Sequence, residues 1–396
     1  MGERRQTATR GVSARQSVTF HKLSSIPLPV PTGTYESPAP LPGDVAYLSP
    51  NGKLFALTLS AANGTARIGT VDPFRTRTVH LGRAVRVVGL TDKYLICANA
   101  DSGQAYVFPV SDRAKLGIPL LWSWPPDLWQ NWLSTSKGLA IETGGYQAGT
   151  LSLTIQNGQR IPLHGGEIYL SSDRRWGVVL TRPRMRWSAS PADFYELQPA
   201  GWSSPVAIWH LSASGGPART ALLRFPEPPA GLNKGQLITQ GIAISLNDRY
   251  VAIQLSELTG TRLTGVTYVY SVHGQLVGTL PYGNGFQWLP SSDGILLNTS
   301  DPRGKGHDRI ISLQGRIVAS WPDAMAETIL PLSETSMLAM RNEVIGRVQQ
   351  GKFRALAGLP KTVQVDWARW LPHGQAAIIE LGGSTTESIW LATLTR

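Results

Sequence analysis

The chain has 396 residues and is 42% hydrophobic, enough to bury a sizeable core in one large repeat domain or in two or three ordinary domains. Glycine (41 residues) and proline (28 residues) are abundant and only 16% of residues are charged, a composition that favours many tight turns. The single cysteine excludes a disulfide framework and a cysteine-based metal cluster, and the net charge of +11 favours acidic partners.

The positive charge is concentrated in residues 1–22 and residues 173–187, each with five basic residues against one acidic residue. Such segments can attract an acidic protein, a nucleic acid or an anionic membrane surface. The rest of the chain is nearly neutral and offers no continuous phosphate track, so a nucleic-acid partner is not expected. Residues 1–16 are predicted to form a disordered basic arm.

No stretch approaches the ~18 consecutive apolar residues that a membrane-spanning helix needs, and no apolar run follows Arg4-Arg5 to complete a twin-arginine signal. The default expectation is therefore a cytoplasmic protein without a membrane span. A place in the cell envelope stays open, because an unseen export signal would give the same sequence from this start.

The first predicted element is an isolated strand at Ser17–Leu23, and the proline-rich stretch Pro27–Pro42 is predicted to lead on from it in extended form. A sequence motif, which we call the repeat phrase, then recurs: an apolar pair is followed by a small polar turn and then by an apolar run, as in Tyr47–Ala56. Asn, Asp and Gly in the turn supply the backbone angles that a tight strand connection needs. The phrase stands at residues 47–56, 89–96, 132–140, 169–178, 244–252, 288–296, 331–339 and 370–377.

The repeats are spaced by 37 to 46 residues, with one larger spacing of 74 residues between Ser171 and Ser245. A period near 40 that contains four short strands is typical of a β-propeller blade. The large spacing indicates either a weak ninth blade near Ser212 or one blade with an insertion at about 182–204, and the insertion is favoured. Trp132, Trp288 and Trp370 hold similar places in their repeats and are predicted to pack between blades.

The last repeat has only three strand signals and ends at Ile389–Leu394, so the strand at Ser17–Leu23 is expected to complete its sheet. The sequence thus predicts an all-β fold over residues 17–396. It would be an eight-bladed antiparallel β-propeller closed by an N-terminal strand, with seven or nine blades as alternatives.

The phrase Ser49-Pro-Asn-Gly-Lys53 resembles the repeat of WD-repeat-like and TolB-like bacterial propellers, which has a Ser-Pro-Asp-Gly core. The resemblance extends in pattern over about residues 45–396. It implies a scaffold that binds proteins or peptides, although a fold does not by itself fix a function.

Motifs for chemistry are absent from the sequence. No Gly-x-Ser-x-Gly elbow and no phosphate-binding Gly-x-x-x-x-Gly-Lys-Ser/Thr run occurs, and no pair among the seven histidines has helical spacing. We therefore assign no catalytic residue, metal ligand or cofactor. Three residues at loop positions are candidates for the rim of a site: Trp129, Arg303 and His307.

The predicted insertion is basic at its start and aromatic further on. Its candidate partner-binding residues are Arg182, Arg184, Arg186, Trp187, Tyr195 and Trp202. Arginine and aromatic side chains are preferred anchors of protein interfaces. A loop that packs over its own blade is the competing interpretation.

The favoured hypothesis is a monomeric, non-catalytic scaffold that binds a protein or peptide, acidic in character, on the face that carries the insertion. The alternative is a propeller enzyme with a polar or metal site at the central channel, of the lactonase or cyclase kind.

Overall fold

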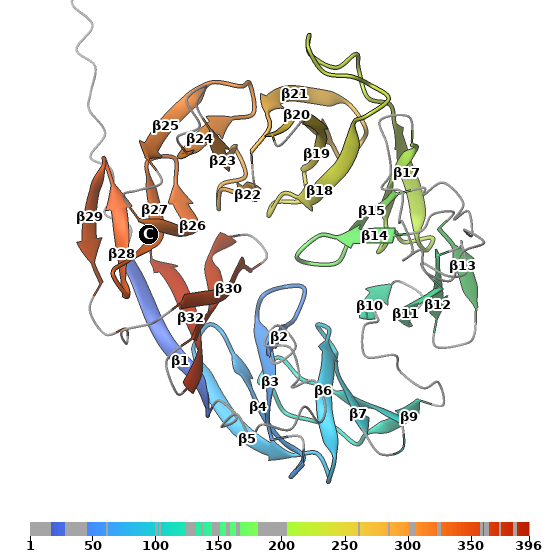
Figure 1. Ribbon diagram of the computed structural model, residues 1–396. Coiled ribbons are helices and arrows are strands. Elements are labelled where there is room, and N and C mark those ends of the chain that lie inside the picture. The colour runs from blue at the N-terminus through green and yellow to red at the C-terminus, as the bar shows by residue number, and fades with distance from the viewer. Residues whose placement is uncertain are drawn as a thin grey trace, which may run out of the picture.

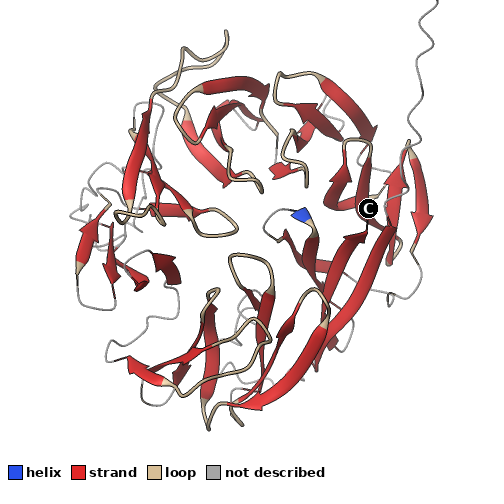
Figure 2. Cartoon of the chain, turned by 180° about the vertical axis from the view of Figure 1, so that it is seen from behind, coloured by secondary structure: helices blue, strands red, loops and turns tan. Residues whose placement is uncertain are grey.

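The computed structural model describes residues 17–27, 46–60, 62–99, 102, 104–122, 132–135, 138–144, 151–155, 159–163, 167–180, 204–259, 262–283, 286–300, 306–322, 326–356, 359, 364–371, 374–382 and 386–395. Every named element in these residues is a β-strand, and the short blue piece in Figure 2 is a single helical turn position beside β31. The prediction of an all-β fold is therefore confirmed.

The described strands form eight four-stranded antiparallel sheets, which we number in chain order. The first four are sheet 1 with β2 (Ala46–Leu48), β3 (Leu54–Ser60), β4 (Thr65–Thr70) and β5 (Arg75–His80); sheet 2 with β6 (Val85–Leu90), β7 (Tyr94–Asn99), β8 (Ala105–Pro109) and β9 (Leu120–Trp122); sheet 3 with β10 (Trp132–Thr135), β11 (Gly138–Gly144), β12 (Leu151–Ile155) and β13 (Arg160–Pro162); and sheet 4 with β14 (Glu167–Leu170), β15 (Trp176–Leu180), β16 (Val206–His210) and β17 (Ala218–Leu223).

The remaining four are sheet 5 with β18 (Ile238–Ile244), β19 (Tyr250–Thr259), β20 (Arg262–Ser271) and β21 (Leu276–Pro281); sheet 6 with β22 (Phe286–Trp288), β23 (Gly294–Ser300), β24 (Gly306–Ser312) and β25 (Ile317–Pro322); sheet 7 with β26 (Glu327–Ser333), β27 (Ser336–Arg341), β28 (Val344–Gln349) and β29 (Lys352–Ala355); and sheet 8 with β30 (Gln364–Trp370), β31 (Ala376–Gly382), β32 (Thr386–Thr395) and β1 (Ser17–Pro27).

The sheets stand around a common centre, and the first strand of sheets 1 to 7 and β30 of sheet 8 lie nearest to it (Figure 1). This arrangement of four-stranded meanders is a propeller-type fold. Strands in the middle of a sheet are buried on both faces, as in the fully buried β31, because neighbouring sheets pack on each side. Outer strands such as β5 are mostly exposed.

Sheet 8 joins the two ends of the chain. β1 pairs antiparallel with β32 from Ser17 opposite Thr395 to Pro27 opposite Thr386. The predicted strand at 17–23 is therefore confirmed and is longer than expected. Buried residues of sheet 8 pack against sheet 1 in a shared cluster that includes Leu23, Leu48, Phe55, Ile378 and Leu391.

Two of the three predicted packing tryptophans can be placed. Trp288 and Trp370 are both buried in one hydrophobic cluster that links sheets 5 to 8. The Trp288 indole Nε1 donates a hydrogen bond of 3.2 Å to the Ala243 carbonyl of the neighbouring sheet. These two residues hold adjacent sheets together, as predicted.

Candidate polar site at the inner turns

The residues predicted for partner binding lie outside the described part of the structure. These are Arg182, Arg184, Arg186, Trp187, Tyr195 and Trp202, together with the rim candidates Trp129 and Arg303. β15 ends at Leu180 and β16 begins at Val206, so the segment joins the second and third strands of sheet 4. Its role stays a prediction.

His307 is described, but it is not in a loop. It lies in β24, opposite Thr299, and its carbonyl accepts a hydrogen bond of 3.3 Å from the Thr299 hydroxyl. The expected polar loop therefore ends before Gly306, because the pairing of β23 with β24 extends to that residue.

Two arginines of the basic segment 173–187 lie in the described part of the structure. Arg174 and Arg175 stand in the turn before β15, whereas Arg182, Arg184 and Arg186 lie outside the described residues.

We call the turn between the first and second strands of each sheet its inner turn. Three inner turns share one hydrogen-bond pattern, in which a serine hydroxyl contacts an Asn or Asp two residues later and accepts a bond from the backbone nitrogen five residues later. The pairs are Ser49 with Asn51, Ser171 with Asp173 and Ser245 with Asn247. This pattern is the physical basis of the repeated polar phrase in the sequence.

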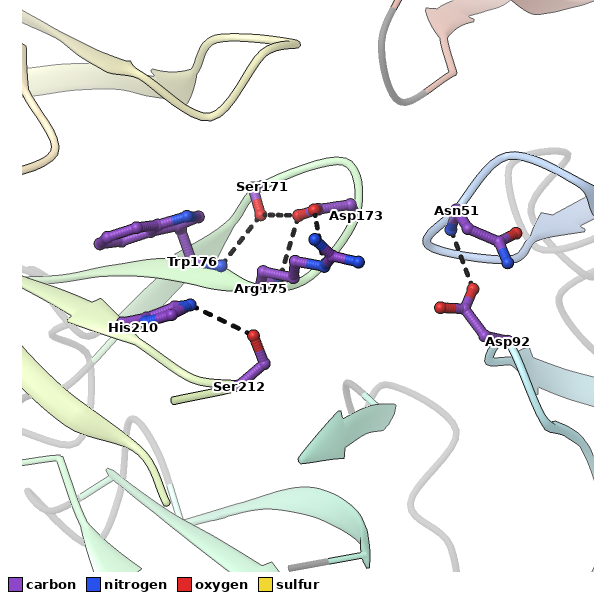
Figure 3. A network of polar contacts seen from close by, with 8 residues as sticks. All are labelled: Asn51, Asp92, Ser171, Asp173, Arg175, Trp176, His210 and Ser212. Atoms are coloured by element: carbon purple, nitrogen blue, oxygen red, sulfur yellow. Dashed lines mark hydrogen bonds and ion pairs between the residues drawn. The ribbon is translucent and has the colours of Figure 1, made fainter. Parts of the chain in front are cut away.

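Side chains also link neighbouring inner turns. The backbone nitrogen of Asn51 donates to Asp92 Oδ1 of sheet 2 at 2.9 Å (Figure 3). In the same way, the backbone nitrogen of Asn247 donates to Ser292 Oγ of sheet 6 at 3.2 Å. Hydrogen bonds thus link the inner turns of sheets 1 and 2 and the inner turns of sheets 5 and 6.

Two carboxyl groups meet where sheets 4 and 5 adjoin. Asp173 is 5% exposed; its Oδ1 accepts bonds from the Ser171 hydroxyl at 2.7 Å and the Arg175 nitrogen at 2.9 Å. Its Oδ2 lies 3.3 Å from Arg175 Nε. Burial raises the pKa of Asp248 to about 9, with a hydrogen bond to Asp173 and the charge of Asp173 as further causes, while Arg175 acts in the opposite direction. Asp248 is therefore protonated at pH 7, beside the Asp173 carboxyl group.

Aromatic rings and an imidazole flank this carboxyl pair. The rings of Trp176 and His210 stack with centroids 4.5 Å apart, and His273 meets Trp176 edge-on at 6.2 Å. His210 Nε2 lies 3.3 Å from the Ser212 hydroxyl (Figure 3). Burial, followed by the charge of Arg175, lowers the pKa of His210 below its ordinary value, so this imidazole is neutral at pH 7.

Arg174 extends from the same turn towards other sheets. Its Nη1 lies 3.5 Å from the Leu90 carbonyl of sheet 2. Burial is the largest cause that lowers its pKa to about 10; the charge of Arg369 in sheet 8 acts in the same direction, whereas Tyr47 and Asp92 act in the opposite direction. Burial also raises the pKa of Asp92. Three other sheets, numbers 1, 2 and 8, therefore contribute charged or polar groups that act on Arg174.

The arrangement can hold a charged group, and a protonated carboxyl beside a carboxylate can also transfer a proton. Within the described residues, no group of three or more His, Cys, Asp or Glu side chains is placed to hold a metal ion. No helix of the described structure is both long enough and apolar enough to cross a membrane.

Sequence reasoning missed this polar site. One signal was available, because the fourth position of the inner turn has a left-handed backbone. The residue at this fourth position is a glycine in sheets 1 and 8 (Gly52 and Gly374). In sheets 4, 5 and 6 it is Arg174, Asp248 and Ser292. A left-handed backbone is uncommon for a non-glycine residue, so these three positions are candidates for closer inspection.

Comparisons with known proteins add the following. No family model matches the chain, and no curated protein matches it. The chain is similar to a crystal structure of the eukaryotic initiation factor, at 12% identity and a TM-score of 0.49, covering 89% of this chain and 90% of that one. It is also similar to the Dos1 propeller, at 10% identity, a TM-score of 0.48 and coverage of 88% and 91%. A third similar structure is Chaetomium thermophilum Sqt1 bound to the N-terminus of the ribosomal protein L10, at 10% identity, a TM-score of 0.44 and coverage of 89% and 96%. All three TM-scores are below 0.5, so the propeller-type fold rests on the sheet topology described above.

Proposed function

We propose that the eight sheets are the eight blades of one propeller, closed by the pairing of β1 with β32, and that this propeller is a non-catalytic scaffold that binds a protein or peptide. The packing of sheet 8 against sheet 1 supports the closure. We assign the chain to the WD-repeat-like and TolB-like propellers as part of the same proposal, and expect it to act as a cytoplasmic monomer.

One observation carries the binding proposal. β15 and β16 pair residue for residue from Trp176 opposite His210 to Leu180 opposite Val206. The sheet is thus complete without residues 181–205, and the same connection in sheet 5 runs only from Thr259 to Arg262. Because the sheet does not require residues 181–205, these residues can serve to bind a partner. The segment also has the arginine and aromatic residues that are frequent in protein interfaces.

In mechanism, Arg182, Arg184 and Arg186 would pair with carboxylates or phosphates of the partner. Trp187, Tyr195 and Trp202 would supply apolar contact area. Binding is therefore expected to weaken as the salt concentration rises.

The test is capture of partners from host lysate by the full chain and by a variant that lacks residues 183–204, followed by titration of the purified partner. Substituting Ala for Arg182, Arg184 and Arg186 together should weaken binding and flatten its salt dependence. The matched control removes three exposed arginines of outer strands, Arg75, Arg219 and Arg354. Equal affinity of the two triple variants would refute the proposal.

A propeller enzyme is the second candidate, and the Asp173–Asp248 pair beside a neutral His210 favours it. Metal analysis of the purified protein and a screen of lactones and small esters test this candidate. Turnover that is lost in Asp248→Asn would support an enzyme, and turnover retained in that variant would exclude this site.

A further inference from the structure

The Ser212 hydroxyl and the His210 imidazole form a pair beside the inner turn of sheet 4 (Figure 3). Ser212 Oγ lies 3.3 Å from His210 Nε2. In the tautomer that carries its proton on Nδ1, this nitrogen accepts a proton from the serine. A hydroxyl within reach of an imidazole base is the arrangement that activates serine as a nucleophile.

The strand register explains why the imidazole is held in this position. His210 ends β16 and stands opposite Trp176 of β15, so the two side chains leave the same face of sheet 4. Their rings stack with centroids 4.5 Å apart and an interplanar angle of 16°. His273, in the turn between β20 and β21, meets the edge of the Trp176 ring. The stacked indole limits the orientations that are open to the His210 ring.

The chain that follows β16 is also anchored. The Leu211 backbone nitrogen donates a hydrogen bond of 2.7 Å to the Arg175 carbonyl, and the Leu211 side chain is buried. The Gly216 nitrogen donates a bond of 2.8 Å to the Ala213 carbonyl and closes a turn directly after Ser212. Ser212 therefore stands between two fixed points of the chain, while its side chain is only half-buried.

The protonation state of His210 suits a base. Burial is the largest cause that lowers its pKa below the ordinary value of 6.5. The charges of Arg175 and His273 act in the same direction, and the charge of Asp173 acts in the opposite direction. The imidazole is therefore neutral at pH 7, which is the form that accepts a proton.

We propose that Ser212 is a nucleophile activated by His210 and that it takes the acyl group of an activated ester. The serine oxygen would bond to the acyl carbon and the ester bond would break. The serine proton would pass to His210 Nε2 and from there to the leaving alcohol. Transfer to one serine requires no turnover, so it is compatible with a non-catalytic scaffold. Neither residues 182–204 nor Asp248 takes part in this step, so its test is independent of the two functions proposed above.

Covalent labelling of the full chain with an alkyl fluorophosphonate tests the nucleophile. The serine oxygen attacks phosphorus in place of the acyl carbon, the P–F bond breaks and fluoride leaves, so the label stays on the attacking residue. Tandem mass spectrometry of the digested chain should locate a label on Ser212. Absence of a label on this residue would overturn the proposal.

Three variants separate activation from simple exposure. Ser212→Ala should remove the label, and His210→Gln should slow labelling of Ser212 by about 100-fold, as expected for the loss of a general base. The control Ser214→Ala changes an exposed serine of the same turn and should leave the rate unchanged. Equal rates of Ser212 labelling in the original chain and in His210→Gln would overturn the role of the imidazole.

The pH dependence of the original chain gives a readout that needs no variant. The labelling rate should rise as His210 loses its proton below pH 6.5 and should then level off, because the base is fully neutral. A rate that instead keeps rising about tenfold with each pH unit would indicate that hydroxide removes the serine proton, and it would contradict activation by His210.

Discussion

At the scale of a single residue, Asp248 is expected to make the free energy of unfolding depend on pH. Its pKa is about 9 in the folded chain against an ordinary value of 3.8, so the folded state keeps a proton that the unfolded state releases across this range. The folded state therefore binds more protons, and this group makes the free energy of unfolding fall as pH rises from about 4 to 9. Asp248→Asn should remove that part of the slope. Urea unfolding at pH 5, 7 and 9 measures it.

The control for this experiment is Asp112→Asn, which changes an exposed aspartate in the turn region between β8 and β9. It should leave the slope unchanged. His210 acts with the opposite sign, because its lowered pKa makes the chain lose stability as pH falls through about 6.5. A slope between pH 7 and 9 that survives in Asp248→Asn would contradict the assignment to this carboxyl.

The sequence predicts each inner turn, but it does not predict which side chains from different inner turns come close to one another. Ser171 with Asp173, and Ser245 with Asn247, are local patterns that indicate a tight turn from the residues themselves. The influence of Asp173 on the pKa of Asp248 depends on how sheets 4 and 5 pack, which no local pattern contains.

At the scale of elements, β1 contributes a buried side chain to the cluster between sheets 8 and 1. Leu23 is 0% exposed and packs there with Phe55 and Leu391. Leu23→Ala should lower the free energy of unfolding by about 2–5 kcal/mol, the range for a buried leucine that leaves a void. Thr19→Ala, at an exposed position of the same strand, should change it by less than about 0.5 kcal/mol. The free energy of unfolding is measured by chemical denaturation. Similar losses in both variants would show that the packing of Leu23 in β1 does not stabilise the fold.

The outer strands differ in how they discourage pairing with other chains. Exposed arginines stand on β5, as Arg75 and Arg77, and exposed basic residues on β29, as Lys352 and Arg354. Charges on an exposed edge oppose the addition of a further strand. Sheet 8 is protected differently, because its outer strand comes from the other end of the chain. The recurring strand-turn-strand motif was predicted from local sequence, whereas the closing strand required reasoning about the whole chain.

At the scale of the whole molecule, the pairing of β15 with β16 should hold sheet 4 together even when its connection is cut. A protease site placed between residues 190 and 191 would divide the chain into two parts. Each part would keep a strand of the pair that joins Trp176 to His210 and Leu180 to Val206, and the two parts would also share β1 with β32.

After cleavage, the two fragments should elute together in size-exclusion chromatography and separate only in denaturant. The uncut chain is the control for elution volume. Fragments that separate without denaturant would show that the connection, and not the sheets, holds the molecule together.

The pairing of β1 with β32 also sets an order of events during synthesis. β1 leaves the ribosome first, and its partner is made more than 350 residues later. At ~5–20 residues per second, β1 waits on the order of 20 to 70 s for that partner. The other sheets are built from consecutive strands and can form as they emerge. Sheet 8 is therefore the last to form, and a ribosome that stalls before β32 leaves a nascent chain with an unpaired strand for chaperones to shield.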